Sequence, residues 1–315
     1  MHIVLCEQFC FILQYYRIAR EKMFSIIIPV FNGEKTIKKT IQSCLNQNYP
    51  DFEILIVDNA SIDMTKEIVK EFSDERISYI YTPLKGRSNA RNIGINNAEF
   101  QYILFLDADD EIDDMLLFKA YNIFIKGNVN GFSYATLYRN TKENSEHVKL
   151  ADLNWKKHLY LWNPFPINSV IINKEIIDEK FNTEFDYNED WLFWYDNLSK
   201  SEIYTEYDYI GAIVNIHENN TMRDRVNMTG YEMIVRIMIK KRLSIITRII
   251  NLPNYLKFMY LYKVLEVKVP KVDNFIKRNS FIHYSLVELL LKIPFVRNTL
   301  KKKLEEVEKI NPFLY

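Results

Sequence analysis

The acidic triplet Asp107-Ala108-Asp109 is the feature of this sequence that most directly indicates chemistry. Carboxylates are hard oxygen ligands, and one or two of them can hold Mg²⁺ or Mn²⁺ while the cation also binds phosphate oxygens. The same residues could instead form a helix N-cap or a solvated acidic loop. The triplet alone is therefore compatible with a divalent-cation site for a phosphate-bearing ligand and with an ordinary acidic turn.

A second acidic pair, Glu189-Asp190, precedes the run Trp191–Leu198, which has helical character. Acidic side chains in the first turn of a helix are stabilised by the helix dipole, which is the purely structural interpretation. A carboxylate within reach of an acceptor hydroxyl can also take its proton as a general base. The pair alone leaves both interpretations open.

Buried strands that alternate with helices would position these groups. Continuous apolar runs rich in β-branched residues predict strands buried on both faces of a parallel sheet, and periodic apolar residues between them predict helices. The strands are expected at 24–30, 53–57 and 102–106, and the helices at 35–46, 63–72 and 88–98. This alternation predicts a doubly wound α/β sheet.

The expected strand ends bring polar residues to one edge of that sheet. Phe31-Asn32 follows the first strand, Asp58 the second, and Asp107 to Asp109 the later one. Ligands of such sheets bind beyond the carboxyl ends of the strands. The triplet is therefore expected at one end of an extended ligand site.

The order of motifs between residues 29 and 110 resembles that of the family 2 glycosyltransferases. The matching segments are Pro29-Val30-Phe31-Asn32, Asn46-Gln47-Asn48-Tyr49-Pro50, Asp58-Asn59-Ala60-Ser61-Ile62-Asp63, Gly86, Ala90-Arg91-Asn92-Ile93-Gly94 and Phe105-Leu106-Asp107-Ala108-Asp109-Asp110. The resemblance implies the GT-A fold, a Rossmann-like, mostly parallel sheet, here with a C-terminal helical appendage. It also implies Mn²⁺ or Mg²⁺ and inverting transfer from a nucleotide-diphosphate sugar, with UDP as the expected nucleotide. The chain departs from the usual pattern at Asn59 and Ala60, where the family commonly has Asp and then Gly.

The resemblance also assigns roles to individual residues. Asp58 would accept a hydrogen bond from uracil, the loop with Pro29, Phe31 and Asn32 would close over the base, Asp107 would lie near the ribose, Asp109 would bind the metal, and Arg91 would serve the donor. Asp190 would be the catalytic base, with Glu189 beside it toward the acceptor. His217 would touch the diphosphate or the metal, although a lone histidine is often only structural.

The composition of the chain limits the remaining classes of function. Residues 226–315 hold 17 Lys or Arg and 7 Asp or Glu, whereas residues 1–225 hold 24 and 34. The acidic segment 1–225 would repel polyphosphate unless a cation intervened, so no nucleic-acid partner is expected. Cys6, Cys10 and Cys44 lack the spacing of a zinc site or a disulfide framework, which favours a cytoplasmic protein.

Two competing functions stay open beside sugar transfer. A nucleotidyltransferase would be expected to carry a Gly-rich phosphate loop after the first strand, where this chain has only Gly33. A non-catalytic scaffold in a polysaccharide assembly complex would not be expected to retain Asp58, Asp107, Asp109 and Asp190. The favoured function is transfer of a sugar to a glycan or lipid-linked acceptor during surface polysaccharide synthesis.

Three regions are expected along the chain. Residues 1–22 would be an extension or an upstream translation start, residues 23–225 the catalytic domain, and residues 226–315 a basic helical region. The catalytic domain would divide into a nucleotide-binding half, 23–111, and an aromatic-rich acceptor half, 112–225. The basic region would either contact anionic lipid at the inner face of the cell membrane or form a solvated cap.

Overall fold

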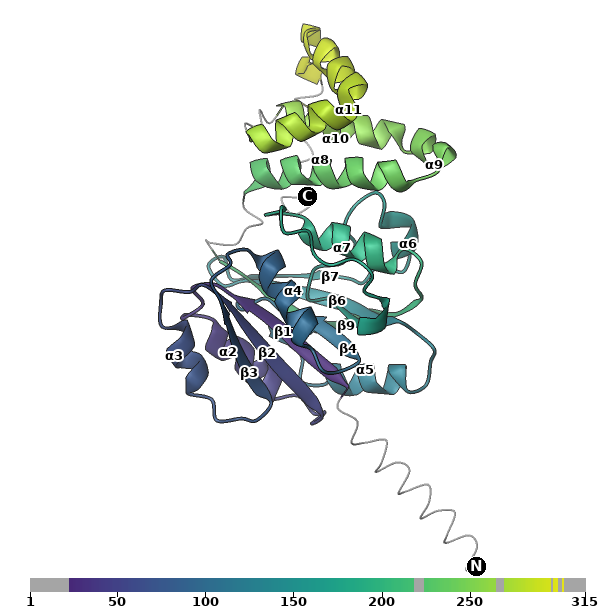
Figure 1. Cartoon of the computed structure of the whole chain (residues 1–315). Coiled ribbons are helices and arrows are strands. Elements are labelled where there is room, and N and C mark those ends of the chain that lie inside the picture. Colours follow the sequence, from purple (N-terminus) through teal and green to yellow (C-terminus); the bar gives the residue numbers. More distant parts are fainter. Residues whose placement is uncertain (1–22, 218–223, 265–268, 296, 300–301, 303–315) are drawn as a thin grey trace, which may run out of the picture. The chain divides into compact units, whose positions relative to one another are not determined.

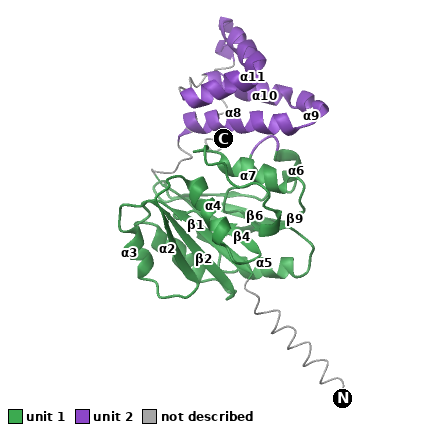
Figure 2. Cartoon of the chain, viewed as in Figure 1, with its two compact units in different colours: residues 1–159, 163–218 green, residues 160–162, 219–315 purple. Residues whose placement is uncertain are grey.

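The computed structural model describes residues 23–217, 224–264, 269–295, 297–299 and 302. The expected extension at residues 1–22 lies outside the described residues. The chain forms two compact units (Figure 2). Unit 1 comprises residues 1–159 and 163–218, and unit 2 comprises residues 160–162 and 219–315.

Four parallel strands form the first half of the sheet in unit 1, in the order β3-β2-β1-β4 (Figure 1). They are β1 (Phe24–Val30), β2 (Phe52–Asn59), β3 (Ile77–Thr82) and β4 (Tyr102–Phe105). The three strands expected from apolar runs correspond to β1, β2 and β4. β3 was not expected, because it lies at the edge of the sheet and only one of its six residues is fully buried.

Helices cover both faces of these strands, as in a doubly wound sheet. They are α2 (Ile37–Leu45), α3 (Thr65–Lys70) and α4 (Arg87–Asn97), each within the range expected from the sequence or one residue beyond it. α2 buries Ile37, Ile41 and Cys44 in the main core. α4 approaches β1 so closely that a Cβ atom on Gly94 would overlap the side chain of Ile27. Only glycine fits this position without moving β1.

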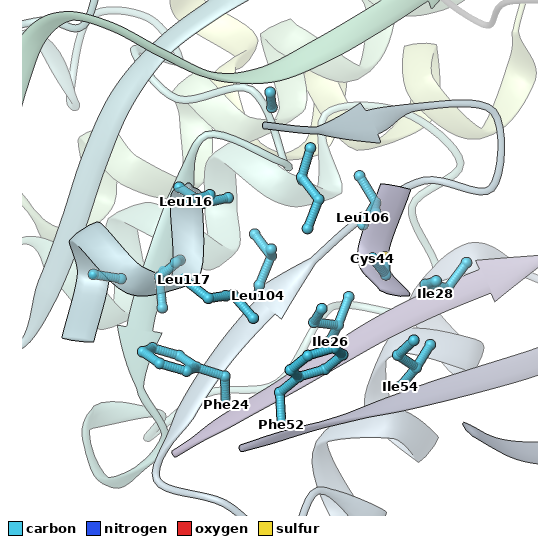
Figure 3. Close-up of a cluster of buried hydrophobic side chains, with 14 of the residues drawn as sticks. Phe24, Ile26, Ile28, Cys44, Phe52, Ile54, Leu104, Leu106, Leu116 and Leu117 are labelled. Carbon is cyan, nitrogen blue, oxygen red and sulfur yellow. The ribbon is translucent and has the colours of Figure 1, made fainter. Parts of the chain in front are cut away.

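The main core lies between the sheet and the helices α2 and α5 (Leu116–Phe124) (Figure 3). Phe24 and Ile26 of β1, Ile54 of β2 and Leu104 of β4 are fully buried there. Burying each such side chain contributes about 1.5 to 3 kcal/mol. The parallel strands that carry the polar edge are therefore firmly held.

The second half of the sheet extends from β4 in the order β8-β6-β9-β5, with β7 also paired to β6. β8 is antiparallel to β4 and β6, whereas β9 is parallel to β6. The strands are β5 (Glu111–Ile112), β6 (Gly131–Asn140), β7 (Ser145–Lys149), β8 (Val170–Asn173) and β9 (Ile203–Ile216). The short helices here are α6 (Trp155–His158), the 3₁₀ turn η1 (Lys174–Ile176) and α7 (Glu189–Leu198).

Most of the aromatic residues of this second half belong to the core. The buried ones include Phe132, Tyr134, Trp155, Phe165, Trp191, Phe193 and Trp194. Phe193 and Trp194 of α7 pack edge-on against Phe105 of β4. α7 is thereby fixed on the sheet face opposite the main core. Trp162 differs from the buried aromatic residues, because it is 43% exposed.

Unit 2 consists of helices α8 (Arg225–Arg242), α9 (Ile245–Ile250), α10 (Leu252–Val264) and α11 (Pro270–Leu291). α8, α10 and α11 pack pairwise against one another. Their shared core includes Met233, Ile237, Met259, Tyr262, Val272 and Ile276. α11 is kinked at Ser280, whose backbone is not helical. Among the described residues, no helix combines the length and apolarity needed to cross a membrane.

Candidate active site

The loops that follow β1 and β2 are joined by hydrogen bonds. The backbone N–H of Asn32 donates to Ser61 Oγ at 2.9 Å, and Asn32 Oδ1 accepts from the backbone N–H of Ile62 at 2.9 Å. Gly33 N–H donates to Thr65 Oγ1 at 2.9 Å. Asn32 has a left-handed backbone with φ of 52°, a conformation that asparagine tolerates better than most residues. The two loops therefore form one preorganised rim.

Asp58 lies at the end of β2, opposite Val30, and is buried. Its Oδ1 accepts from the backbone N–H of Ser61 at 2.8 Å, and its Oδ2 accepts from the hydroxyl of Tyr79 at 2.5 Å. Burial and the hydrogen bond to Asp58 raise the pKa of Tyr79. Tyr79 therefore stays a neutral donor that orients the carboxylate.

A hollow of about 330 Å³ opens beside Asp58. It is lined by Asp58, Ser61, Ile62, Asp63, Lys66, Glu67, Tyr79 and Tyr81. Its volume is in the range of small-molecule sites, and its tyrosines offer flat faces. Phe31 is 48% exposed on the neighbouring loop, with Lys85 Nζ 5.5 Å from its ring centre, and Pro29 is buried within β1.

Arg91 joins the acidic triplet to the second acidic pair. Its Nη2 donates to Asp107 Oδ1 at 2.7 Å and its Nη1 to Glu189 Oε1 at 2.8 Å, with the Arg91 side chain only 1% exposed. Burial alone would lower the pKa of Arg91, but the charges of Asp107 and Glu189 raise it. Arg91 is thus bound to two carboxylates, and its visible role is to position them.

The same arrangement keeps Asp107 ionised. Burial opposes its ionisation, but the charges of Arg91 and Arg87 and the hydrogen bond from Arg91 hold its pKa below the usual range. Arg87 Nε also lies 3.6 Å from Glu189 Oε1. A charged carboxylate at the carboxyl ends of the parallel strands can accept hydrogen bonds from a ribose hydroxyl.

Asp109 and His217 meet although 108 residues separate them in the sequence. His217 Nε2 lies 2.7 Å from Asp109 Oδ2, directly after the end of β9. Burial and the charge of Asp107 raise the pKa of Asp109, against the opposing effect of His217. The pair presents one carboxylate oxygen and one imidazole nitrogen, and both side chains are partly exposed.

This donor set fits a catalytic divalent cation better than a structural one. Within the described part of the chain, no group of three or more His, Cys, Asp or Glu could hold a metal ion. Mg²⁺ and similar cations at phosphate-transfer sites are held by one or two protein ligands, while phosphate oxygens and waters complete the shell. Asp109 with His217 matches that incomplete protein set.

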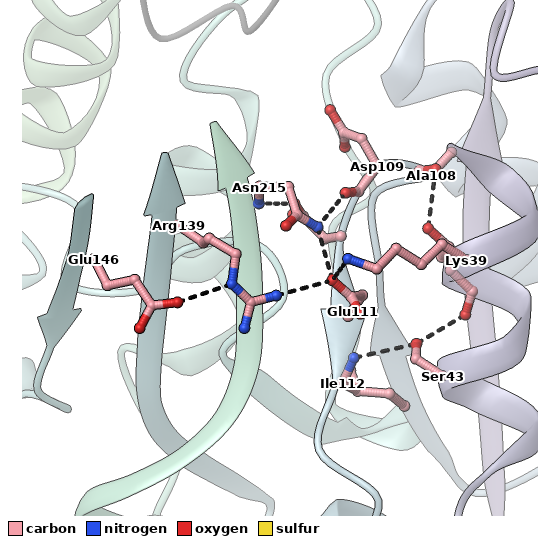
Figure 4. Close-up of polar contacts among 11 residues, drawn as sticks. Lys39, Ser43, Ala108, Asp109, Glu111, Ile112, Arg139, Glu146 and Asn215 are labelled. Carbon is pink, nitrogen blue, oxygen red and sulfur yellow. Dashed lines mark hydrogen bonds and ion pairs between the residues drawn. The ribbon is translucent and has the colours of Figure 1, made fainter. Parts of the chain in front are cut away.

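A network of charged and amide groups fixes the backbone beneath Asp109 (Figure 4). Asn215 Nδ2 donates to the Asp109 carbonyl at 2.8 Å and to Glu111 Oε1 at 3.1 Å. Glu111 also pairs with Lys39 at 2.6 Å and with Arg139 at 3.5 Å. These partners come from α2, β6 and β9, so the position of Asp109 depends on elements from distant parts of the sequence.

Asp110 follows the candidate metal ligand Asp109, but its contacts indicate a structural role. It is buried, with Oδ2 accepting from Asn168 Nδ2 at 2.9 Å and Oδ1 from the Asn215 backbone N–H at 3.0 Å. Burial, followed by the charges of Asp109 and Asp107, raises its pKa well above the ordinary value. Asp110 therefore ties the triplet loop to β9 and to the segment before β8.

Asp190 is the second residue of α7 and is held from two sides. Its Oδ1 accepts from the backbone N–H of Trp191 at 2.8 Å, and its Oδ2 accepts from Asn163 Nδ2 at 2.9 Å. Burial and the neighbouring charge of Glu189 raise the pKa of Asp190 to about 6, against the opposing charge of Arg91. A carboxylate with this pKa is ionised at neutral pH and is a stronger base than an ordinary aspartate.

Several side chains around these carboxylates were not anticipated from the sequence. Asn163 binds Asp190, and the charge of Asp190 affects the pKa of both Tyr138 and Lys149, which places these two groups near it. Burial raises the pKa of Tyr138 and lowers that of Lys149. They lie on β6 and β7, where no spacing signal marks them.

The mixed α/β sheet carries an acidic motif at the carboxyl ends of its parallel strands. This chain has the GT-A fold of nucleotide-sugar transferases. The chain belongs to glycosyl transferase family 2, whose model matches residues 25–187. The resemblance drawn from the motifs and the expected GT-A fold are thereby confirmed.

Relatives with curated names agree with this membership. An uncharacterized glycosyltransferase of Haemophilus influenzae is 34% identical over 166 residues, which cover 49% of this chain and 64% of that protein. The Escherichia coli UDP-Glc:alpha-D-GlcNAc-diphosphoundecaprenol beta-1,3-glucosyltransferase WfgD is 30% identical over 184 residues, covering 58% and 72%. The chain thus spans just under two thirds of the first relative.

Solved structures share the fold at low sequence identity. Residues 1–349 of Staphylococcus aureus TarS superpose with a TM-score of 0.62 at 20% identity, covering 90% of this chain and 88% of that one. The mannosyltransferase PcManGT from Pyrobaculum calidifontis, in complex with GDP-Man and Mn²⁺, gives 0.57 at 15% identity, covering 92% and 90%. At these identities the likeness concerns the fold.

Proposed function

We propose that this chain transfers a sugar from a UDP-sugar to an acceptor hydroxyl, with inversion at the anomeric carbon. The observation that carries the proposal is the bridge made by Arg91 between Asp107 and Glu189. It joins the strand ends expected to bind the donor to the start of α7, where Asp190 lies. One buried side chain thus sets the donor end and the base end relative to each other.

The uridine would bind at the rim formed by the loops after β1 and β2. Asp58 retains lone pairs on both oxygens, and one of them would accept the N3–H of uracil. The exposed ring of Phe31 and the loop of Asn32 would cover the base, and Asp107 would accept from the ribose. UDP is favoured because TarS has been solved with UDP-GlcNAc and WfgD is named for UDP-Glc.

Asp109 and His217 would hold a divalent cation, Mn²⁺ or Mg²⁺. When bound, the cation would neutralise charge on the departing diphosphate. The support is the ligand pair itself, with its separation of 2.7 Å, together with the Mn²⁺ in the mannosyltransferase complex. Asn215 would keep the carbonyl of Asp109 in place.

Asp190 would act as the general base. In a single displacement, the acceptor oxygen forms a bond to the anomeric carbon as the bond to the diphosphate oxygen breaks, and the acceptor proton passes to Asp190. Its raised pKa and its hydrogen bond from Asn163 suit this role. Glu189 would act through Arg91 by holding the start of α7.

The acceptor would be a glycan or a lipid-linked sugar used for surface polysaccharide. WfgD is named for a diphosphoundecaprenol-linked acceptor, which supports a lipid-linked substrate. Residues 23–111 would bind the nucleotide and residues 112–225 the acceptor. The basic region 226–315 would contact anionic lipid at the inner face of the membrane.

A screen of UDP- and GDP-sugars for Mn²⁺-dependent hydrolysis tests the proposal without knowledge of the acceptor. We expect release of UDP from one UDP-sugar, loss of release in the presence of a chelator, and near-normal donor binding by Asp190→Asn. Asp208→Asn is the matched control, because Asp208 is an exposed carboxylate on β9. If neither UDP nor any UDP-sugar binds with or without Mn²⁺, the enzyme proposal fails and a scaffold role gains support.

A further inference from the structure

Helix α9 exposes four isoleucines that the described part of unit 2 does not cover. Ile245 and Ile246 are each 72% exposed, Ile249 is 66% exposed and Ile250 is 70% exposed. α9 contains no buried residue at all. In α8, by contrast, Met233 and Ile237 are buried in the core of unit 2. The apolar residues of α9 therefore do not serve this core.

The four isoleucines form one continuous face. Successive helical residues are turned by about 100°, so these side chains fall within an arc of about 140°, with Arg248 on the opposite side. Figure 1 shows α9 as the short helix at the turn between α8 and α10. Contiguous exposed apolar surface on a soluble protein commonly marks a site of interaction.

The sequence on both sides of α9 is rich in cations and lacks acidic residues. Residues 233–265 contain seven Lys or Arg and no Asp or Glu. Lys240, Lys241 and Arg242 form the last turn of α8, directly before α9. Burial and the charge of Arg248 lower the pKa of Lys240, as expected where cations crowd together.

The turn that presents α9 is well defined. Arg248 Nε donates to the Leu243 carbonyl at 2.8 Å, and its Nη2 donates to the Lys241 carbonyl at 2.6 Å. Ser244 Oγ accepts from the backbone N–H of Thr247 and caps α9. The isoleucines are thus held on an ordered turn.

We propose that α9 inserts its four isoleucines into the headgroup boundary of an anionic bilayer, while the adjacent cations bind lipid phosphates. The inference deepens the membrane contact in the proposed function by naming the element that makes it. An apolar face flanked by Lys and Arg is the pattern of helices that lie in a membrane interface. Charge opposes the pairing of two copies through α9, because two basic surfaces would repel each other.

Binding of the full chain to vesicles tests this inference. The vesicles contain either phosphatidylcholine alone or equal parts of phosphatidylcholine and phosphatidylglycerol. We expect the intact chain to prefer the anionic vesicles. Replacing all four isoleucines of α9 with serine should lower the partition coefficient at least about tenfold. Leu153→Ser is the matched control, because Leu153 is a 62% exposed aliphatic residue of unit 1, and it should bind like the intact chain.

Charge variants separate the two contributions. Lys241→Gln and Arg242→Gln should each weaken binding to anionic vesicles by roughly fivefold while leaving binding to neutral vesicles unchanged. Equal binding of the charge variants and the intact chain to anionic vesicles would overturn the proposed role of these cations.

Insertion is measured separately with brominated lipids, which quench nearby tryptophan. Ile249→Trp should gain vesicle-dependent quenching that Leu153→Trp does not gain. Phe281 and Ile282 of α11 are also exposed, at 67% and 77%, and their double serine variant is the comparison within unit 2.

If that α11 variant loses binding and the α9 variant keeps it, insertion by α9 is wrong, although the membrane contact stands. If the intact chain binds neither kind of vesicle, the membrane contact and the α9 inference both fail, and the proposed sugar transfer is unaffected.

Discussion

Arg91 of α4 and Glu189 of α7 form a buried ion pair across 98 residues of sequence, with 2.8 Å between Arg91 Nη1 and Glu189 Oε1. Because Arg91 also binds Asp107, this pair connects the acidic triplet to the start of α7. The candidate base, Asp190, is the next residue after Glu189. One guanidinium therefore links the acidic triplet to the helix that carries Asp190.

Replacing Arg91 should separate charge from geometry. Arg91→Met leaves two carboxylates without their partner and should lower the free energy of unfolding by about 3 to 5 kcal/mol. Arg91→Lys keeps the charge but cannot reproduce the fork that binds both carboxylates, so turnover should fall by roughly 10²-fold or more. Urea unfolding and initial rates measure the two effects.

The matched control for Arg91→Lys is Arg76→Lys. Arg76 also pairs with an aspartate, Asp74 at 2.8 Å, on a partly exposed turn outside the site. This variant should retain nearly full turnover. If Arg91→Lys is as active as Arg76→Lys, the bridge is not needed for catalysis.

The pH dependence of the reaction should report the ionisation of Asp190. Burial raises the pKa of this carboxyl from 3.8 to about 6, and only the ionised form can accept the acceptor proton. The rate should therefore fall as the pH drops through about 6 and should level off above it. Asp190→Asn should remove this limb and lower turnover by roughly 10²-fold or more.

Asp208→Asn should leave the pH profile unchanged, which controls for loss of a carboxylate elsewhere. The rate of the intact enzyme is measured under conditions in which proton transfer limits turnover. A rate that stays constant between pH 5 and 8 would exclude Asp190 as the base.

The adjacent residues Asp109 and Asp110 should respond differently to the same change. Asp109→Asn should weaken Mn²⁺ binding in the presence of UDP by at least about tenfold, because an amide is a weaker ligand than a carboxylate. Asp110→Asn should instead cost about 1 to 3 kcal/mol of stability, because its new amide nitrogen would face one of the two donors, Asn168 Nδ2 or the Asn215 backbone N–H.

Calorimetric titration of Mn²⁺ and urea unfolding distinguish the two variants. His217→Ala should follow Asp109→Asn in its effect on the metal, because both side chains belong to the proposed ligand pair. If Asp110→Asn loses Mn²⁺ and Asp109→Asn does not, the ligand assignment is wrong.

Tyr79→Phe tests whether the orientation of Asp58 matters for the nucleotide. Removing the hydroxyl deletes a hydrogen bond of 2.5 Å to a buried carboxylate and should weaken UDP binding by roughly tenfold. Tyr81→Phe is the control, because Tyr81 lines the same hollow and is 56% exposed. Equal UDP affinities of the two variants would show that the carboxylate needs no orientation by Tyr79.

The sequence alone determined the family and the parallel half of the sheet. Runs such as Phe24–Val30 are apolar on both faces because helices cover both sides of the sheet. Such runs can be recognised as buried strands from the sequence. The motif residues Asp58, Asp107 and Asp109 follow those runs directly, and parallel strands bring their ends to one edge. β3 was missed because an edge strand exposes much of its surface.

Tertiary structure decided what the individual side chains contact. Arg91 binds both Asp107 and Glu189, and no local pattern could reveal a pairing across 98 residues. The raised pKa of Asp190 results from burial and from the charge of Glu189, and burial exists only in the packed chain. The exposure of the isoleucines in α9 also depends on tertiary structure. The sequence of that helix resembles a core segment, and only the packed structure shows that no other described element covers it.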